Sequence, residues 1–139
     1  GRIMSEISLE ALHLAVKAVE DALDDYRYAA ENQPRLLLSV RDGAIQRFEV
    51  AMDLTRQIVI RVLKEKYAMD EASAKKGWIR EAAKLGMIAD AERWFGFLSA
   101  RDRTSHTYDS EIAARVFAQI DDFLSNARDL LQRLPSHVA

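Results

Sequence analysis

The chain has 139 residues, is 49% hydrophobic and carries a formal net charge of −2. That length allows one domain with a sizeable core and leaves no room for a second. The near-neutral charge argues against a protein that coats nucleic acid, because such a protein gains its affinity by neutralising many phosphates. The lack of cysteine excludes disulfides, thiolate metal sites and a cysteine nucleophile.

Targeting and metal-binding patterns are missing from the sequence. No apolar run approaches the roughly 20 residues of a membrane span, and no signal peptide is recognisable, so we expect a cytoplasmic protein without membrane contact. His13, His106 and His137 are far apart and fit no ligand pattern, so neither a metal centre nor a cofactor is expected. Residues 1–3 precede Met4, a natural start, and are interpreted as an expression remnant.

Hydrophobic periodicity predicts two long helices in the first half of the chain. The first spans about residues 8–32, where apolar residues recur at steps of three and four, and it ends before Pro34. The second begins at Leu37 or Asp42 and runs to Tyr67. Its apolar stripe is wide, so we expect burial on more than one side, against a neighbouring helix and a second subunit.

A shorter third helix is predicted over about residues 71–85, with Gly86 as its left-handed C-terminal cap. It contributes to a basic zone that admits two interpretations. The zone borders an RNA or nucleotide path, with Lys75 and Lys76 as anion-binding residues, or it is a solvated face paired with glutamates, which is the favoured interpretation. The basic residues are Lys64, Lys66, Lys75, Lys76, Arg80 and Lys84, and the glutamates are Glu65, Glu71 and Glu81.

A fourth helix, capped by Asp90, is predicted to end near Arg101. Its aromatic residues Trp94 and Phe97 have the spacing of core residues, and we expect them in the core instead of stacked on bases.

The last predicted helix begins at Asp109 or Ser110 and continues to Leu134, where Pro135 ends it. Four long helical patterns and one short one, without an alternating strand pattern, predict an all-α protein. We expect a single domain over residues 1–139, folded as an up-and-down four-helix bundle with an additional short helix.

The stretch that begins at Arg101 and contains His106 and Tyr108 carries the chemistry. On a continuous helix, a separation of five residues turns two side chains about 140° apart. Thr104-Ser105 weakens helix here, so we expect a break between Arg101 and His106. An extended backbone from His106 to Tyr108 would then project both of those side chains to one side.

These groups suit a phosphodiester substrate. Arg101 would hold the non-bridging oxygens, and His106 would deprotonate or position a ribose 2′-hydroxyl. Arg103 and Ser105 are further candidates for anion or RNA binding. Metal-free cleavage also needs an acid, which a two-fold homodimer would supply as a second His106.

A structural interpretation of the same residues stands beside the catalytic one. An arginine near a helix end satisfies carbonyl groups or pairs with a neighbour, here Asp102 or Asp109. A histidine in a turn is often a satisfied polar group, and an interface phenol donates one hydrogen bond without ever being modified.

The pattern Arg101-x4-His106-x-Tyr108 resembles the Arg-x4-His-x-Tyr signature of the HEPN superfamily (higher eukaryotes and prokaryotes nucleotide-binding). It is most similar to the branch called nucleotidyltransferase substrate-binding proteins, which is related to the HepT toxins. Supporting matches are Ile45-Gln46-Arg47-Phe48-Glu49, Ile79-Arg80-Glu81-Ala82, Leu85-Gly86-Met87-Ile88 and Glu92-Arg93-Trp94.

The resemblance implies a dimeric helical bundle with the arginine and histidine lining a cleft at the interface, and a minimal nucleotidyltransferase as partner. In the toxin branch the HEPN protein is a metal-independent ribonuclease, silenced when the partner transfers AMP to the motif tyrosine. Carried over, Arg101 and His106 would be the catalytic pair and Tyr108 the acceptor. Many relatives have Asn where this chain has Asp102.

Two other functions remain open from the sequence. One is a non-catalytic subunit that presents substrate or nucleotide to the transferase, and the other is a purely structural helical dimer. If the protein is a ribonuclease, its activity would depend on His106. If it is a non-catalytic binding subunit, its binding would depend on Arg101.

Overall fold

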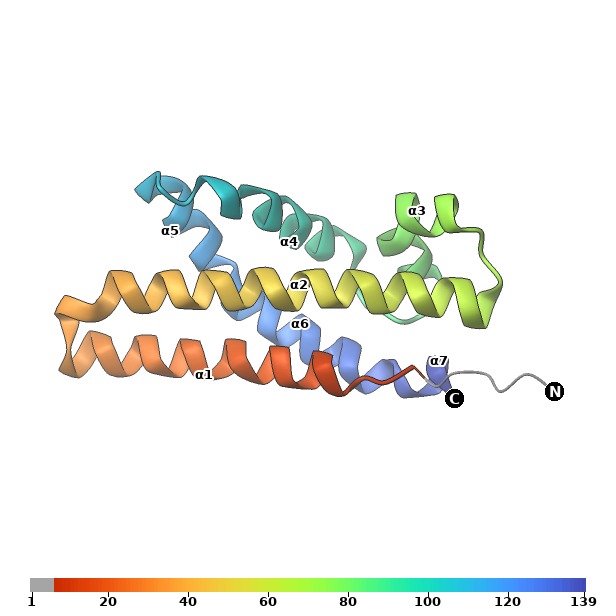
Figure 1. The fold of residues 1–139 in the computed structure, drawn as a ribbon, viewed down its shortest axis with the longest axis horizontal. Coiled ribbons are helices and arrows are strands. Elements are labelled where there is room, and N and C mark those ends of the chain that lie inside the picture. The colour runs from red at the N-terminus through yellow and green to blue at the C-terminus, as the bar shows by residue number, and fades with distance from the viewer. Residues whose placement is uncertain (1–6) are drawn as a thin grey trace.

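The computed structural model describes residues 7–139, which form a helical bundle without a strand in that range (Figure 1). The all-α prediction is thereby confirmed. The helices are α1 (Glu10–Asn32), α2 (Leu37–Tyr67), α3 (Glu71–Lys84), α4 (Ala91–Arg103), α5 (Ser110–Ala118), α6 (Ile120–Arg133) and α7 (Pro135–Val138), with 3₁₀ turns η1 (Pro34–Leu36) and η2 (Thr104–His106). The interpretation of residues 1–3 lies outside the described range.

Helices α1 and α2 form a long antiparallel hairpin (Figure 1). The predicted end before Pro34 is confirmed, and the ring of Pro34 opens the short η1 turn that reverses the chain. Of the two predicted starts for α2, Leu37 is right and Asp42 is wrong. Helix α1 begins at Glu10, and Ser8 accepts a hydrogen bond at 3.3 Å from the backbone N–H of that residue.

Helix α2 is the central element of the bundle. It packs against α1, α3, α4, α5, α6 and α7, so its wide apolar stripe is covered from several directions. The prediction of burial on more than one side is confirmed. Neighbouring helices of the same chain already provide this burial, so the width of the stripe does not require a second subunit.

Side-chain caps set the starts of three helices. Asp70, Asp90 and Asp109 each accept hydrogen bonds from backbone N–H groups in the first turn of α3, α4 and α5, respectively. Gly86 follows α3 with φ of +80°, the left-handed conformation that its position as a C-terminal cap predicts. The short linkers between helices are therefore specified locally by sequence.

The single last helix predicted from the sequence is two helices, α5 and α6, which meet at Gln119. The N–H of Gln119 bonds the carbonyl of Val116, at 3.1 Å, in a tightened turn. Because the backbone of Gln119 stays in the right-handed helical region, the apolar period continues almost unbroken across the junction. The hydrophobic pattern alone could not reveal the break.

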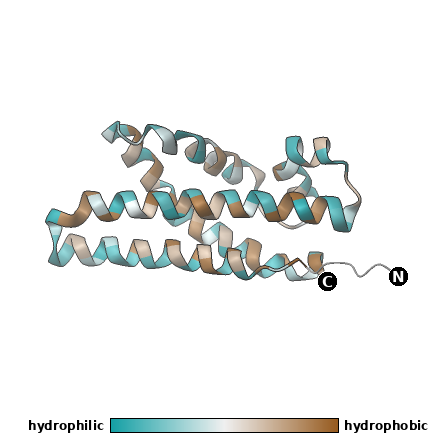
Figure 2. Ribbon diagram, viewed as in Figure 1, coloured by the Kyte–Doolittle hydropathy of each residue, from teal (hydrophilic) through white to brown (hydrophobic). Residues whose placement is uncertain are grey.

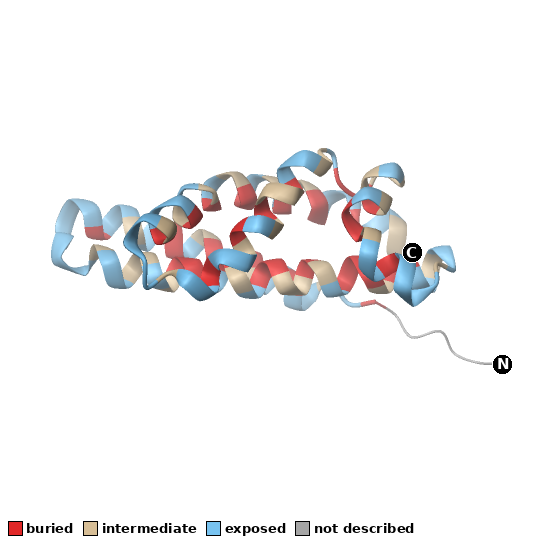
Figure 3. Cartoon of the chain, turned by 90° about the horizontal axis from the view of Figure 1, so that it is seen from above, coloured by how far each residue is buried: buried red, intermediate tan, exposed pale blue. Residues whose placement is uncertain are grey.

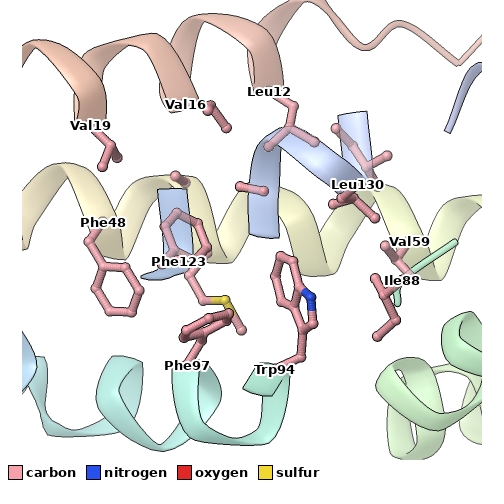
Figure 4. Close-up of a cluster of buried hydrophobic side chains, with 14 of the residues drawn as sticks. Leu12, Val16, Val19, Phe48, Val59, Ile88, Trp94, Phe97, Phe123 and Leu130 are labelled. Atoms are coloured by element: carbon pink, nitrogen blue, oxygen red, sulfur yellow. The ribbon is translucent and has the colours of Figure 1, made fainter. Parts of the chain in front are cut away.

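The core centres on aromatic side chains from three helices (Figure 4). The ring of Phe123 lies 4.9 Å from that of Phe48, 5.8 Å from Trp94 and 5.5 Å from Phe97, in edge-to-face arrangements. All four side chains are at most 2% exposed. The placement of Trp94 and Phe97 in the core is confirmed.

Apolar residues form stripes along the helices, interrupted by polar ones (Figure 2), and the buried residues face the bundle interior (Figure 3). None of the helices between residues 7 and 139 combines the length and the hydropathy of a membrane span. His13 is exposed on α1.

Replacing Phe123 by Ala should lower the free energy of unfolding by about 3–5 kcal/mol, because it opens a cavity where three aromatic contacts converge. Urea denaturation monitored by circular dichroism measures the loss. Tyr28→Ala is the control, since Tyr28 is 63% exposed and its loss should change stability by less than about 0.5 kcal/mol. Equal effects for the two variants would contradict this core assignment.

Candidate functional site

The predicted helix break after Arg101 is present: α4 ends at Arg103 and the η2 turn follows. The extended conformation predicted from His106 to Tyr108 is wrong, because Thr107 has φ −74° and ψ −1°. Hydrogen bonds close the turn and explain the difference. The Thr107 hydroxyl donates to the Thr104 carbonyl at 3.2 Å, and the backbone N–H of Asp109 donates to the His106 carbonyl at 3.1 Å.

Arg101 is clamped between α4 and α2. Its Nε and Nη2 donate to the two carboxylate oxygens of Asp53 at 2.7 and 2.9 Å, a bidentate pair, and Nη2 lies 3.7 Å from Glu49. Its Nη1 donates at 3.0 Å to the hydroxyl of Thr104, which in turn donates to the Arg101 carbonyl at 2.7 Å. The guanidinium is therefore fixed on three sides.

Asp53 is the site residue that sequence reasoning missed. The alternative ion pairs of Arg101 with Asp102 or Asp109 are wrong within the described residues, where its partners are Asp53 and Glu49. A usable signal was present: Glu49 and Asp53 are four residues apart on one face of α2, and they are the only carboxylates between residues 43 and 64. Two acids on one face of a helix suggest that a cation packs against them, but they do not identify which one.

The pairing also settles the charge of Arg101. Its hydrogen bond to Asp53 raises the pKa of Arg101 above the ordinary value, and the nearby charges of Asp53 and Glu49 add to the rise, while partial burial opposes it. The guanidinium thus stays protonated at any working pH. It is a permanent cation whose orientation depends on α2.

His106, the last residue of the η2 turn, and Tyr108, two residues later, are both exposed on the surface. Their rings are 6.0 Å apart at 77°, an edge-to-face contact, and Tyr108 is 86% exposed. Within residues 7–139, no hydrogen bond links His106 to Arg101. The chain therefore brings His106 beside Tyr108, and holds Arg101 separately against α2.

Local charge does not favour a phosphate on Arg101 alone. Around its guanidinium stand the carboxylates Glu49 and Asp53, and the charge of Asp102 also acts on it. Arg103 is exposed next in the chain and adds one positive charge. Three carboxylates thus outnumber two cations, so a bound anion requires further positive charge from elsewhere.

The remaining predicted site residues fall into two regions. Ser105 is exposed beside the turn, and its hydroxyl contacts the Asp102 carbonyl at 3.4 Å. Lys75 and Lys76 lie on α3, where they line surface pockets together with residues of α2. The structure therefore leaves Arg103 and Ser105 near the helix break and places the two lysines in a separate, basic region.

Ion pairs bear out the favoured interpretation of the basic zone in part. Glu71 pairs with Lys64 at 3.0 Å and with Lys75 at 3.6 Å, and Lys84 lies 3.4 Å from Glu81. For Lys76 and Arg80, no ion pair forms within the described part of the chain. Pairing with glutamate therefore neutralises part of the zone and leaves part of it cationic.

In the part of the chain that the structure describes, no three His, Cys, Asp or Glu side chains come close enough together to hold a metal ion. The groups around the helix break are instead a clamped guanidinium, an exposed imidazole and an exposed phenol. Side chains of these three kinds can, in general, bind anions, transfer protons and accept transferred groups, respectively.

An all-α bundle with an arginine, a histidine and a tyrosine at a helix break defines a HEPN-type, HepT-like domain. The family model described as nucleotidyltransferase substrate binding protein like matches residues 8–136, and the chain belongs to this family.

Two kinds of relative agree with this assignment. The probable ribonuclease HepT of Haemophilus influenzae is 39% identical over 95 residues, which are 66% of this chain and 65%, slightly less than two thirds, of that protein. A Haemophilus influenzae structure described as the substrate-binding domain of a nucleotidyltransferase has a TM-score of 0.80 and 31% identity, covering 92% of this chain and 99% of its own. A crystal structure from Thermus thermophilus has a TM-score of 0.63 and 31% identity, covering 84% and 98%.

Replacing Asp53 by Ala should release the Arg101 side chain, because the bidentate pair is its main anchor. Arginine side-chain ¹⁵N spectra measure this: the Nε–H signal of Arg101 should exchange faster with water and broaden. Asp102→Ala is the matched control, since it removes a neighbouring carboxylate that makes no hydrogen bond to Arg101 in the described chain. An Arg101 signal that is unchanged in Asp53→Ala would contradict the clamp.

Proposed function

We propose that this chain is a metal-independent endoribonuclease, the toxin of a toxin–antitoxin pair, whose partner is a minimal nucleotidyltransferase that transfers AMP to Tyr108. The observation that carries the proposal is the exposure of His106 and Tyr108 side by side on the turn that follows a clamped Arg101. A proton-transfer group and a phenol are thus both reachable by a second molecule. The similarity to a probable ribonuclease HepT supports the same function.

In the proposed cleavage step, His106 removes the proton of a ribose 2′-hydroxyl, whose oxygen attacks the adjacent phosphorus. The bond from phosphorus to the 5′-oxygen breaks, that oxygen takes a proton from an acid, and a 2′,3′-cyclic phosphate remains. Arg101 stabilises the charge that grows on the non-bridging oxygens. Nη1 donates one hydrogen to Thr104 and keeps a second one for that role, because Asp53 holds the Nε–Nη2 edge of the guanidinium.

The acid of this step is proposed to come from a second copy of the chain. Each chain carries one histidine at the helix break, and a two-fold homodimer places two such histidines at a shared cleft. The exposure of His106 and Tyr108 supports this arrangement, because both side chains remain available for such a contact.

Regulation is proposed to act on Tyr108. Its phenolic oxygen attacks the α-phosphorus of ATP held by the nucleotidyltransferase, the bond to the β-phosphate oxygen breaks, and pyrophosphate leaves as the phenol loses its proton. The product carries a bulky anion on Tyr108, whose ring centre lies 6.0 Å from that of His106. That group blocks the histidine sterically and repels RNA phosphates.

A second candidate is a non-catalytic subunit that binds substrate or nucleotide for the nucleotidyltransferase. The observation that favours it is the clamp itself, since Asp53 and Glu49 neutralise Arg101 and weaken its grip on a phosphate under transfer. The similarity to a structure described as a nucleotidyltransferase substrate-binding domain is consistent with it. This candidate predicts nucleotide binding that weakens on Arg101→Ala, without RNA cleavage.

Replacing His106 by Ala should lower the rate of RNA cleavage by a factor of roughly 10²–10⁴, because general base catalysis is lost. The rate is measured on total RNA with purified protein in excess EDTA, which should leave wild-type cleavage intact. His13→Ala, at an exposed histidine of α1, is the matched control and should cleave normally. Equal cleavage by wild type and His106→Ala, or cleavage by neither, would defeat the nuclease proposal.

Co-expression with the nucleotidyltransferase should add AMP to Tyr108, which peptide mass spectrometry detects. Tyr108→Phe should abolish the adduct because the acceptor oxygen is removed. Tyr28→Phe removes a phenol of similar exposure on α1 and should leave the adduct in place. An unmodified Tyr108 in the presence of active transferase and ATP would refute regulation at this residue.

A further inference from the structure

Two adjoining surface pockets follow α2 away from Arg101 toward α3. Each has a volume of about 260 Å³, and they share Arg56 and Lys75 in their linings. We call the two together the basic groove. Its charged lining residues are Arg56, Arg61, Lys64, Lys75, Lys76, Arg80 and Glu65. Six cations against one carboxylate contrast with a chain whose acidic residues outnumber its basic ones overall.

Part of this positive charge is available to a ligand. Arg61 pairs with Glu65, and Glu71 pairs with Lys64 and Lys75. Arg56, Lys76 and Arg80 form no ion pair with any carboxylate among residues 7–139. These three cations surround the pocket formed by α2, α3 and α4.

The same pocket has an aromatic wall. Phe95 of α4 lines it, and the guanidinium of Arg80 lies 5.2 Å from the centre of that ring. Arg80 thus rests on an aromatic face, and its planar group offers a stacking surface for a base. A kink at Gly77, where φ is −116° and ψ is 23°, lies between Lys76 and Arg80 on the pocket lining.

The basic groove begins one helical turn from the Arg101 clamp. On α2, Arg56 is three residues after Asp53, and on α4, the lining residue Leu98 is three residues before Arg101. Three residues of helix correspond to about 4.5 Å along the axis. The cations of the groove therefore lie close to the Arg101 clamp, where Glu49, Asp53 and Asp102 leave a deficit of positive charge.

We propose that the basic groove holds single-stranded RNA next to the cleavage site, with Arg56, Lys76 and Arg80 on consecutive phosphates and a base stacked on the Arg80–Phe95 pair. This inference rests on the proposed ribonuclease function and names the path of its substrate. Backbone phosphates with a stacked base are the features that a cationic groove with an aromatic wall recognises. A single strand fits because its bases are free to stack.

The test measures binding of a fluorescein-labelled oligouridylate of about ten nucleotides, a length within the usual range of single-strand sites, by fluorescence anisotropy at several salt concentrations. All proteins carry His106→Ala so that RNA remains intact. Adding Arg56→Gln, Lys76→Gln and Arg80→Gln should reduce the slope of log affinity against log salt by roughly 2, since each phosphate contact on a single strand contributes about 0.7.

The matched control removes the same number of charges from α1 and α6: Lys17→Gln, Arg27→Gln and Arg128→Gln, whose side chains lie in exposed ion pairs away from the groove. It should leave the salt slope unchanged. Phe95→Leu should weaken binding by about fivefold or more without changing the slope, because stacking is uncharged. Circular dichroism confirms that each variant is folded.

An unchanged affinity and slope in the groove variant would overturn the inference. It is also overturned if the groove variant loses binding to the nucleotidyltransferase while RNA binding stays normal, because the groove would then be a protein interface. Failure of the nuclease proposal is separable: groove-dependent RNA binding without any His106-dependent cleavage would leave the groove assignment standing and remove only the catalytic step.

Discussion

The bidentate pair between Asp53 and Arg101 is the interaction on which the site depends. It ties the end of α4 to the middle of α2, the helix that contacts most of the bundle. Because Thr104 bonds both the guanidinium and the carbonyl of Arg101, the same pair fixes the first residue of the η2 turn. His106 at the end of this turn and Tyr108 just after it therefore follow directly from the anchored end of α4.

The anchor has an electrostatic cost. A guanidinium held by one carboxylate, with a second at 3.7 Å, attracts a phosphate less strongly than a free one would. Fixed geometry offsets part of this loss, since a side chain that is already ordered loses less entropy when it binds. The cations of the basic groove and a second subunit are the proposed sources of the remaining positive charge and of the acid.

Local sequence signals predicted the boundaries of most helices. Aspartate caps, Pro34 and Gly86 act on their nearest neighbours, so the helix starts at residues 90 and 109 and the helix ends at Pro34 and Gly86 could be recognised without a structure. The junction at Gln119 escaped prediction because its backbone stays helical and no Pro or Gly marks it. The extended turn at Thr107 was predicted wrongly because hydroxyl-to-carbonyl bonds favour a compact turn.

The composition of the site was predictable and its contacts were not. Arg101, His106 and Tyr108 stand out in a short stretch of sequence, whereas Asp53 is 48 residues away from its partner. Such a pair depends on how α4 docks on α2, which no periodicity specifies. The same holds for the basic groove. The number of basic residues identified a basic zone, but only the packing of α2 against α3 shows which of these cations are paired with glutamate.

The central claim is that Arg101 and His106 act on one phosphodiester. Titrating the protein with an RNA analogue that lacks the 2′-hydroxyl, and therefore cannot be cleaved, tests it directly. The account predicts that the Arg101 Nε–H and the His106 ring signals shift together in NMR spectra, with one shared saturation curve. Saturation of binding with either signal unmoved would contradict it.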